Sequence, residues 1–446
     1  MIILSQINFY EMKQLVGLAF LVLLFITCEN KKSTSFSSPF VTVKDGKFFR
    51  NDKPYYYMGA NYWYGMNLGS KGEGGDRNRL IRELDQMQQM GITNLRVIGL
   101  TEGPDGSPYR ILPAVQDTPG ILKEELLVGL DFFLNEMKKR DMTAVVVLNN
   151  FWPWSGGMAQ YEEWNSLDSI PYPPPHPGGT WDGYQKYTAQ FYTNKKAIGQ
   201  YKNAVKSILT RKNTVNRTMY ADDPTIMAWE LCNEPRGINN TTAFNLWIDS
   251  TASFIKSFAP KQLVTTGSEG FTASKEFSGT DFVSGHDGTK IDYTTVHIWI
   301  QNWDWYNPAE HEKTYPSAKQ KMLDYLHEHA KLSKKLGKPY VLEEFGIMRD
   351  SGSFNPNSST KNRDIYYKEV FEAVYQLAKK GEASGVNFWA YGGEGRPSSL
   401  ASWWKKGDDF TGDPPHEPQG WYSVNHTDTS TISIIREYAT KFNKGF

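Results

Sequence analysis

Two glutamates each follow a short apolar segment and stand in distinctive surroundings. Glu234 lies in Trp229–Pro235 (WELCNEP), and Glu344 lies in Val341–Gly346 (VLEEFG). A pair of carboxyl groups is the minimum for cleaving a glycosidic bond, because one protonates the leaving oxygen while the other attacks the sugar or activates water. Their environments must hold their pKa values apart. A lone glutamate is usually a surface ion-pair partner, but two such motifs together favour catalysis.

Other polar and aromatic side chains also stand where apolar segments end. Arg96 is a candidate to keep Glu344 ionised, and Asn233 can donate to a sugar 2-hydroxyl. His297 can orient a carboxylate or bind sugar, and an indole such as Trp389 can form a floor under a pyranose ring. The residues predicted to bind substrate are Arg96, Asn233, His297, Trp299, Trp389, Trp63, Asn150 and Trp152.

The elements that must position these residues alternate between apolar strands and amphipathic helices. The predicted strands are 55–60, 94–99, 143–149, 225–231, 262–266, 293–299, 340–345 and 385–391. The predicted helices are 77–90, 122–140, 184–212, 243–259, 317–336, 365–380 and 432–442. Strands that are apolar almost throughout are typical of a parallel sheet buried on both faces. Helical crossovers between them favour an α/β fold.

Such strands form either an open sheet or a closed barrel. The glycine-rich stretch Gly69–Gly75 (GSKGEGG) lacks the GxGxxG spacing of a dinucleotide site and the Lys-Ser/Thr of a phosphate loop. Eight strand–helix units therefore favour a (β/α)8 TIM barrel, whose catalytic groups lie at the carboxyl ends of the strands. We expect residues 40–446 to form one catalytic domain with long βα loops.

Composition narrows the function further. The 446 residues carry 49 basic and 49 acidic side chains, so no basic field would attract nucleic acid. Aromatic residues make up 14%, which fits either a large core or a sugar-binding cleft. The two cysteines, Cys28 and Cys232, exclude a disulfide framework. We expect a monomer.

The N-terminus has the features of a targeting signal. An apolar run, Leu15–Thr27, follows Lys13 and is too short for an ordinary membrane span. It ends at Cys28 in a pattern that resembles a bacterial lipobox, so residues 1–28 are predicted to be a signal peptide with Cys28 as the lipid attachment site. Residues 29–39 are predicted to be a flexible tether. We expect a secreted or cell-surface, outer-membrane lipoprotein, whose start codon is Met1 or Met12.

Other chemistries fit less well. His327 and His329 are two residues apart on a predicted helix, so they face different sides and cannot share one metal ion. Serine hydrolase chemistry lacks a GxSxG elbow. We expect neither metal nor cofactor. A non-catalytic, sugar-binding surface lipoprotein remains an alternative, although a binder would not need the two carboxylates.

With these residues together, the sequence resembles glycoside hydrolase family 5, in the clan of eight-stranded barrel retaining hydrolases. Finer features resemble its endo-β-1,4-mannanase subgroup. These features are Gly59–Tyr64 (GANYWY), Asn149–Gly157 (NNFWPWSGG) and Gly393–Pro397 (GEGRP). One departure is Trp299, which stands where family members often have a tyrosine that donates a hydrogen bond to the nucleophile.

The resemblance implies retention through a covalent glycosyl-enzyme, with Glu234 as acid/base and Glu344 as nucleophile, about 5 Å apart. Glu343 is the neighbour that could be confused with Glu344, but alternation along a strand lets only one of them point into the barrel mouth. The implied activity is endo-hydrolysis of β-1,4-mannosidic linkages in mannan, galactomannan or glucomannan. A β-1,4-glucanase or another family 5 specificity is the alternative, because mannose and glucose differ only at C2.

Overall fold

The computed structural model describes residues 38–446, of which Pro39–Phe446 form one compact unit. Eight parallel strands form one sheet, in the order β8-β7-β6-β5-β4-β11-β10-β9. The strands are β4 (Tyr57–Asn61), β5 (Asn94–Ile98), β6 (Thr143–Val147), β7 (Ile226–Glu230), β8 (Leu263–Thr265), β9 (Thr294–Ile298), β10 (Tyr340–Phe345) and β11 (Gly385–Phe388). Every residue of these strands is buried, as expected for a sheet covered on both faces.

The sheet curves into a nearly closed barrel whose seam lies between β8 and β9. No strand ladder joins these two strands, but two backbone hydrogen bonds bridge them. Asp292 N donates to Val264 O at 2.8 Å, and His297 N donates to Glu269 O at 3.1 Å. The predicted (β/α)8 barrel is confirmed, and each predicted strand lies within a few residues of an observed one.

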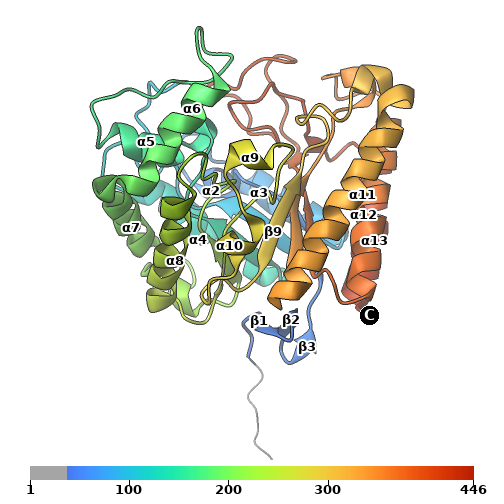
Figure 1. Ribbon diagram of the computed structural model, residues 1–446, viewed down its shortest axis with the longest axis horizontal. Coiled ribbons are helices and arrows are strands. Elements are labelled where there is room, and N and C mark those ends of the chain that lie inside the picture. Colours follow the sequence, from blue (N-terminus) through green and yellow to red (C-terminus); the bar gives the residue numbers. More distant parts are fainter. Residues whose placement is uncertain (1–37) are drawn as a thin grey trace, which may run out of the picture. The chain divides into compact units, whose positions relative to one another are not determined.

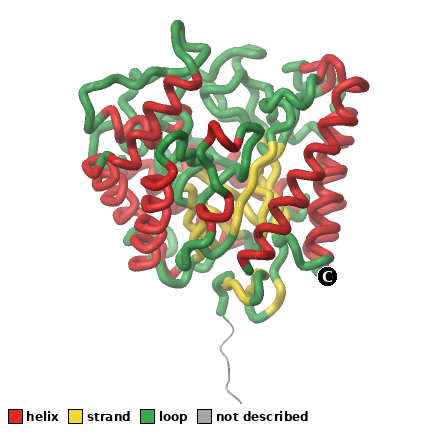
Figure 2. Tube along the Cα trace, viewed as in Figure 1, coloured by secondary structure: helices red, strands yellow, loops and turns green. Residues whose placement is uncertain are grey.

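Helices surround the strands, as Figure 2 shows by its red outer layer around a yellow centre. The long helices are α3 (Arg77–Gln89), α4 (Glu124–Lys139), α7 (Lys195–Leu209), α8 (Thr241–Phe258), α11 (His311–Leu336), α12 (Lys361–Lys379) and α13 (Thr429–Lys444). The continuous helix predicted over 184–212 is wrong. It is two helices, α6 (Trp181–Thr188) and α7, because the side chain of Asn194 caps a new helix by accepting from Lys196 N and Ala197 N.

A small antiparallel sheet, which the sequence patterns did not predict, covers the amino-terminal end of the barrel. It consists of β1 (Thr42–Lys44), β2 (Lys47–Arg50) and β3 (Lys53–Pro54). Phe48 packs against Tyr57 at the start of β4 and against Tyr293 just before β9, with ring centroids 6.3 and 5.3 Å apart. Figure 1 shows this sheet at the opposite end of the barrel from the long loops.

The carboxyl-terminal end of the barrel carries the long loops and several short elements. The short helices there are α2 (Gly65–Gly69), α5 (Gly157–Glu163) and α9 (Lys275–Ser278), whereas α10 (Phe282–His286) packs lower down, against α8 and α11. The longest irregular segment, 394–423, connects β12 (Tyr391–Gly393) to β13 (Val424–Asn425). Figure 1 shows it arching over the barrel beside α6.

Within residues 38–446, no helix is both long enough and apolar enough to cross a membrane. The predicted signal peptide, its lipid attachment site Cys28 and residues 29–37 of the predicted tether lie outside the described residues.

Candidate active site

The two catalytic candidates lie together at the carboxyl-terminal mouth of the barrel. Glu344 is near the end of β10, and Glu234 is in the turn after β7. One oxygen from each lies within 4.8 Å of the other. Glu234 has φ of +52°, a conformation that non-glycine residues rarely adopt and that is common at active sites. Its amide donates to Gly267 O at 2.9 Å, which holds this turn against the chain after β8.

Both carboxylates open into a pocket of about 460 Å³ whose walls are rich in tryptophan. Indole rings offer flat apolar faces to the CH groups of a sugar and an N–H to its hydroxyls. The lining residues are Trp152, Trp154, Trp181, Gln185, Asn233, Glu234, Arg236, Glu269, Trp299, Asn302, Trp303, Glu344, Trp389, His416, Glu417 and Trp421. The pocket therefore combines the predicted carboxylate pair with surfaces suited to pyranose rings.

Arg96 is the charged centre beneath the pocket and is almost fully buried. Its guanidinium makes a bidentate pair with Glu230, at 2.8 and 2.5 Å, and a very short contact with Glu344 Oε1. It also donates to the side-chain oxygens of Asn61 at 3.0 Å and Asn233 at 2.8 Å. A buried cation against Glu344 favours the ionised form that a nucleophile needs. Burial raises the pKa of Glu230 to about 8, although Arg96 opposes the shift.

Glu234 is held by three N–H groups. Trp152 Nε1 donates to its Oε2 at 2.5 Å, and Trp299 Nε1 donates to its Oε1 at 3.2 Å. His297 Nδ1 lies 2.6 Å from the same Oε1 and 3.2 Å from Glu344 Oε2. Burial raises the pKa of Glu234, but the hydrogen bond and charge of His297 outweigh it and hold that pKa below its usual value.

His297 itself is fully buried. Burial lowers its pKa, but the charge of Glu344 and the hydrogen bonds to the glutamates outweigh burial and raise the pKa well above 6.5. Glu234 and His297 therefore share a proton over the 2.6 Å between Oε1 and Nδ1. In one form the proton is on the imidazole, and in the other it is on Glu234, ready for a leaving oxygen.

A β-bulge in β10 changes the simple alternation expected for Glu343 and Glu344. The register with β9 shifts between Leu342 and Glu344, so that Glu344 is paired with His297. Only Glu344 lines the pocket, as expected from the sequence. Glu343 nevertheless does not face the helices, because its Oε2 lies 3.7 Å from His297 Nε2 inside the barrel. Bulges are common beside active sites, where they redirect a side chain.

Two predicted substrate-binding residues, Trp63 and Asn150, do not line the pocket, and a third, Trp299, lines it with an unexpected partner. Trp63 does not line the pocket; its indole donates to Gly412 O at 3.1 Å and packs against Phe410. Asn150 lies behind the pocket and accepts from Asn233 Nδ2 at 3.1 Å. Trp299 lines the pocket, but its N–H reaches Glu234 rather than the nucleophile candidate.

The predicted residues Asn233, Trp152 and Trp389 line the pocket, whereas Arg96 and His297 lie just behind it and contact the carboxylates.

Sequence reasoning missed a charged pair in the pocket wall. Arg236, two residues after Glu234, makes a bidentate salt bridge with Glu269 at 2.7 and 2.9 Å. Its guanidinium stacks over the ring of Trp152 at 4.8 Å. Burial raises the pKa of Glu269 to about 7, although Arg236 opposes the shift. The closeness of Arg236 to the Asn-Glu-Pro motif was the available signal.

Glu234, His297 and Glu344 are also residue types that bind divalent metals, and their candidate ligand atoms lie within 4.8 Å of one another. These groups already have partners within the protein: Arg96 contacts Glu344, and His297 Nδ1 lies 2.6 Å from Glu234 Oε1.

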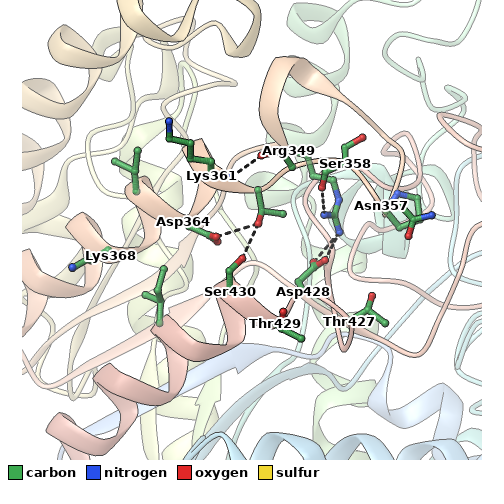
Figure 3. Close-up of a pocket in the computed structure, with 15 residues that line it drawn as sticks. Arg349, Asn357, Ser358, Lys361, Asp364, Lys368, Thr427, Asp428, Thr429 and Ser430 are labelled. Atoms are coloured by element: carbon green, nitrogen blue, oxygen red, sulfur yellow. Dashed lines mark hydrogen bonds and ion pairs between the residues drawn. The ribbon is translucent and has the colours of Figure 1, made fainter.

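A larger hollow of about 790 Å³ lies between the amino-terminal ends of α12 and α13, away from these carboxylates. Figure 3 shows Arg349 and Asp428 paired in its wall, at 2.6 and 2.8 Å, among hydroxyl side chains. It contains no aromatic side chain and neither catalytic candidate. The smaller pocket is therefore the candidate active site.

A (β/α)8 barrel that holds two carboxylates this close at its carboxyl-terminal mouth is built like a retaining glycoside hydrolase. The family model described as "GH family 5 beta-mannosidase-like" matches residues 38–445. The chain belongs to glycoside hydrolase family 5.

Three relatives illustrate the similarity. A crystal structure of a family 5 mannosidase from Rhizomucor miehei is 41% identical, covers 92% of this chain and 98% of its own, and superposes with a TM-score of 0.84. Mannan endo-1,4-beta-mannosidase 5 of Arabidopsis thaliana is 30% identical over 86% of this chain and 84% of its own length. An endo-1,4-beta-D-mannanase from Thermotoga petrophila is 25% identical, covers 86% and 99% of the two chains, and has a TM-score of 0.65.

The raised pKa of His297 predicts a pH-dependent contribution to stability. Its folded pKa lies above the usual 6.5, so protonation stabilises the fold fully below about pH 6.5, and this stability is lost as pH rises through the raised value. We expect His297→Gln to be less stable than the wild type at pH 6 by about 1.4 kcal/mol or more, the free energy that corresponds to a tenfold change in proton affinity. The gap should close at alkaline pH. Denaturant unfolding of both proteins from pH 6 to 10 measures this, and a constant gap would contradict it.

Proposed function

We propose that this enzyme hydrolyses β-1,4-mannosidic linkages by double displacement, with Glu344 as nucleophile and Glu234 as acid/base. The observation that carries the proposal is the separation of at most 4.8 Å between oxygens of the two carboxyl groups, inside a tryptophan-lined pocket. Retaining enzymes place these groups about 5 Å apart, whereas inverting enzymes leave about 6.5–9.5 Å for a water molecule. The choice of mannose as the sugar is supported by the relatives that are named as mannan-cleaving enzymes.

In the first step, a carboxylate oxygen of Glu344 attacks the anomeric carbon, and the bond from that carbon to the leaving oxygen breaks. The proton that His297 Nδ1 shares with Glu234 moves to Glu234, which gives it to that oxygen. In the second step, Glu234 takes a proton from water, whose oxygen attacks the same carbon and displaces Glu344. Arg96 contacts Glu344 and favours its ionised form. Asn233 lines the pocket and its Nδ2 donates to Asn150, so the second N–H of the same amide is available for the sugar 2-hydroxyl.

The assignment is tested with Glu234→Ala and Glu344→Ala on mannan and on an aryl β-mannoside. Both variants should lose about 10²–10⁴-fold or more in turnover of mannan while still binding oligosaccharide. Glu234→Ala should retain far more of the bond-breaking step on the aryl substrate, because that leaving group needs no proton. Glu344→Ala should lose both. Equal losses on both substrates in the two variants would refute this assignment of roles. Activity on carboxymethyl-cellulose but not on mannan would refute mannan as the substrate.

The position of cleavage has two candidates. The names of the Arabidopsis thaliana and Thermotoga petrophila relatives support endo-cleavage of mannan, galactomannan or glucomannan, as the sequence motifs imply. A specific feature of the pocket favours the second candidate, which is removal of terminal mannose. The similarity to a family 5 mannosidase and the match to a beta-mannosidase-like family model support this second candidate.

That feature is an aromatic wall formed with the loop 394–423. Trp152 meets Trp181 of α6 edge-on at 5.6 Å, and Trp181 meets His416 of the loop at 5.3 Å. Tyr109 packs against the same histidine at 5.3 Å. Beside the wall, Glu417 Oε2 is buried without a hydrogen-bond partner among the described residues, and burial raises the pKa of this carboxyl well above its usual value. A carboxyl group with an unpaired oxygen can form hydrogen bonds with the sugar hydroxyls at the end of a mannan chain.

The products of a defined mannohexaose, together with the viscosity of mannan, separate the two candidates. Endo-cleavage predicts an early fall in viscosity and a mixture of oligosaccharides. Removal of chain ends predicts mannose as the main early product with little loss of viscosity. In the second case, Trp181→Ala and His416→Ala should raise activity on mannan relative to mannobiose, because the wall is opened. Unchanged ratios in both variants would show that the wall does not set the position of cleavage.

We also propose that the enzyme is a surface lipoprotein attached through Cys28. The support is the apolar segment that ends at this cysteine. A Cys28→Ala variant expressed in a bacterial host should leave the membrane fraction, and the wild-type N-terminal peptide should carry acyl chains by mass spectrometry. Equal membrane recovery of both proteins, with no acylated peptide, would remove the proposal.

A further inference from the structure

Glu343 is a buried carboxylate that the double displacement does not use. Its side chain is fully buried and does not line the pocket. Neither carboxylate oxygen has a hydrogen-bond partner among residues 38–446. The nearest cationic atoms are His297 Nε2 at 3.7 Å and Arg96 Nε at 3.9 Å, both from Oε2. A buried carboxylate with so few partners is costly unless cations face it, and each unpaired buried group calls for an explanation.

Because of the bulge in β10, both nitrogens of the His297 imidazole face carboxylates. Nδ1 of His297 faces Glu234 and Glu344, at 2.6 and 3.2 Å, and Nε2 faces Glu343. A neutral ring with hydrogen on Nδ1 would direct the lone pair of Nε2 at Glu343. A neutral ring with hydrogen on Nε2 would direct the lone pair of Nδ1 at both catalytic carboxylates. Only the doubly protonated ring presents N–H to both sides.

We propose that Glu343 is a positioning residue for the reaction, which keeps His297 doubly protonated and oriented so that Nδ1–H points at Glu234 and Glu344. Glu343 touches no sugar and acts only through the ring. This proposal rests on the double displacement proposed above.

The charges around His297 support this role. His297 faces Glu234 and Glu344 through Nδ1 and Glu343 through Nε2. Its charge also acts on Glu230 and Glu269, which are paired with Arg96 and Arg236. Because the groups against the ring itself are acidic, a positive charge on the ring is favoured. Glu343 faces the nitrogen on the far side from the pocket, where bound sugar cannot displace it.

Removing the charge of Glu343 should therefore weaken the hold of His297 on its second proton. In Glu343→Gln we expect the pKa of His297 to fall by about one unit or more, since an oppositely charged group within about 4–6 Å changes a pKa by about one to three. The alkaline limb of the kcat/KM profile should move to lower pH by about the same amount. KM at the optimum should change less than about twofold, because the variant leaves the pocket lining intact.

Four variants (Glu343→Gln, Asp131→Asn, His297→Gln and the His297→Gln/Glu343→Gln double variant) and one spectroscopic measurement test this. Asp131→Asn is the matched control: it removes a carboxylate of α4 that is equally buried and is paired with Arg211 at 2.7 Å, in the outer helix layer. It should lower the melting temperature without moving the pH profile. In a His297→Gln background, adding Glu343→Gln should shift the profile no further. An unshifted profile in Glu343→Gln, or an additional shift in the double variant, would overturn the proposal.

The spectroscopic measurement does not depend on turnover. ¹⁵N-histidine NMR of the wild type, with His297 identified by its loss in His297→Gln, should show both ring nitrogens protonated at about pH 8, and in Glu343→Gln the second proton should be lost at lower pH. A ring that titrates near its usual 6.5 would overturn the proposal. If mannoside hydrolysis fails while Glu343→Gln still lowers the pH at which the ring loses its second proton, the proposed activity is at fault and the role of Glu343 in charging the ring stands.

Discussion

The buried guanidinium of Arg96 is the interaction on which the rest of the site depends. It joins β5 to β7 through Glu230 and to β10 through Glu344. It also reaches Asn61 at the end of β4, whose side-chain N–H groups bind Glu343 O at 2.8 Å and Phe388 O at 3.2 Å. One cation thus fixes five strands around the barrel mouth. Breaking such a buried pair typically costs about 3–5 kcal/mol, because the partner charge is left uncompensated.

One guanidinium is not enough for the acidic groups gathered there. Glu230, Glu343 and Glu344 lie within 4 Å of Arg96. Glu234 lies beside His297, whose ring also faces Glu343 and Glu344. The barrel interior therefore favours an extra proton, and the imidazole is the group placed to share it. An enzyme that must alternately give and take a proton at Glu234 needs that proton to be bound but movable. A distance of 2.6 Å between Nδ1 and Oε1 meets that need.

Much of this could be predicted from sequence because it depends on local pattern. Apolar strands with polar residues at their ends located the barrel, the carboxylate pair, Arg96 and His297 to within a residue or two. The β10 bulge could not be predicted, since it is a property of how β10 pairs with β9 rather than of either strand alone. The small sheet over residues 42–54 was missed because such short strands carry little periodic signal. The hydrogen bond from the Trp299 indole to Glu234 could not be predicted either, because it depends on the orientation of the ring, which alternation along a strand does not determine.

Trp63 shows how a conspicuous aromatic residue can serve the pocket without touching it. The loop 394–423 has almost no regular structure of its own, so its position must come from buried anchors. Trp63 binds Gly412 O, Arg79 binds Phe410 O at 2.7 Å, and Glu83 accepts from Glu394 N at 2.6 Å. These anchors are core residues that contact neither catalytic carboxylate. The strands and charges inside the barrel thus determine the chemistry. The loop 394–423, which these buried anchors hold in place, determines how much of a substrate chain the pocket admits. Selection could change where the chain is cut by altering loop contacts, while Arg96 and its carboxylates stayed the same.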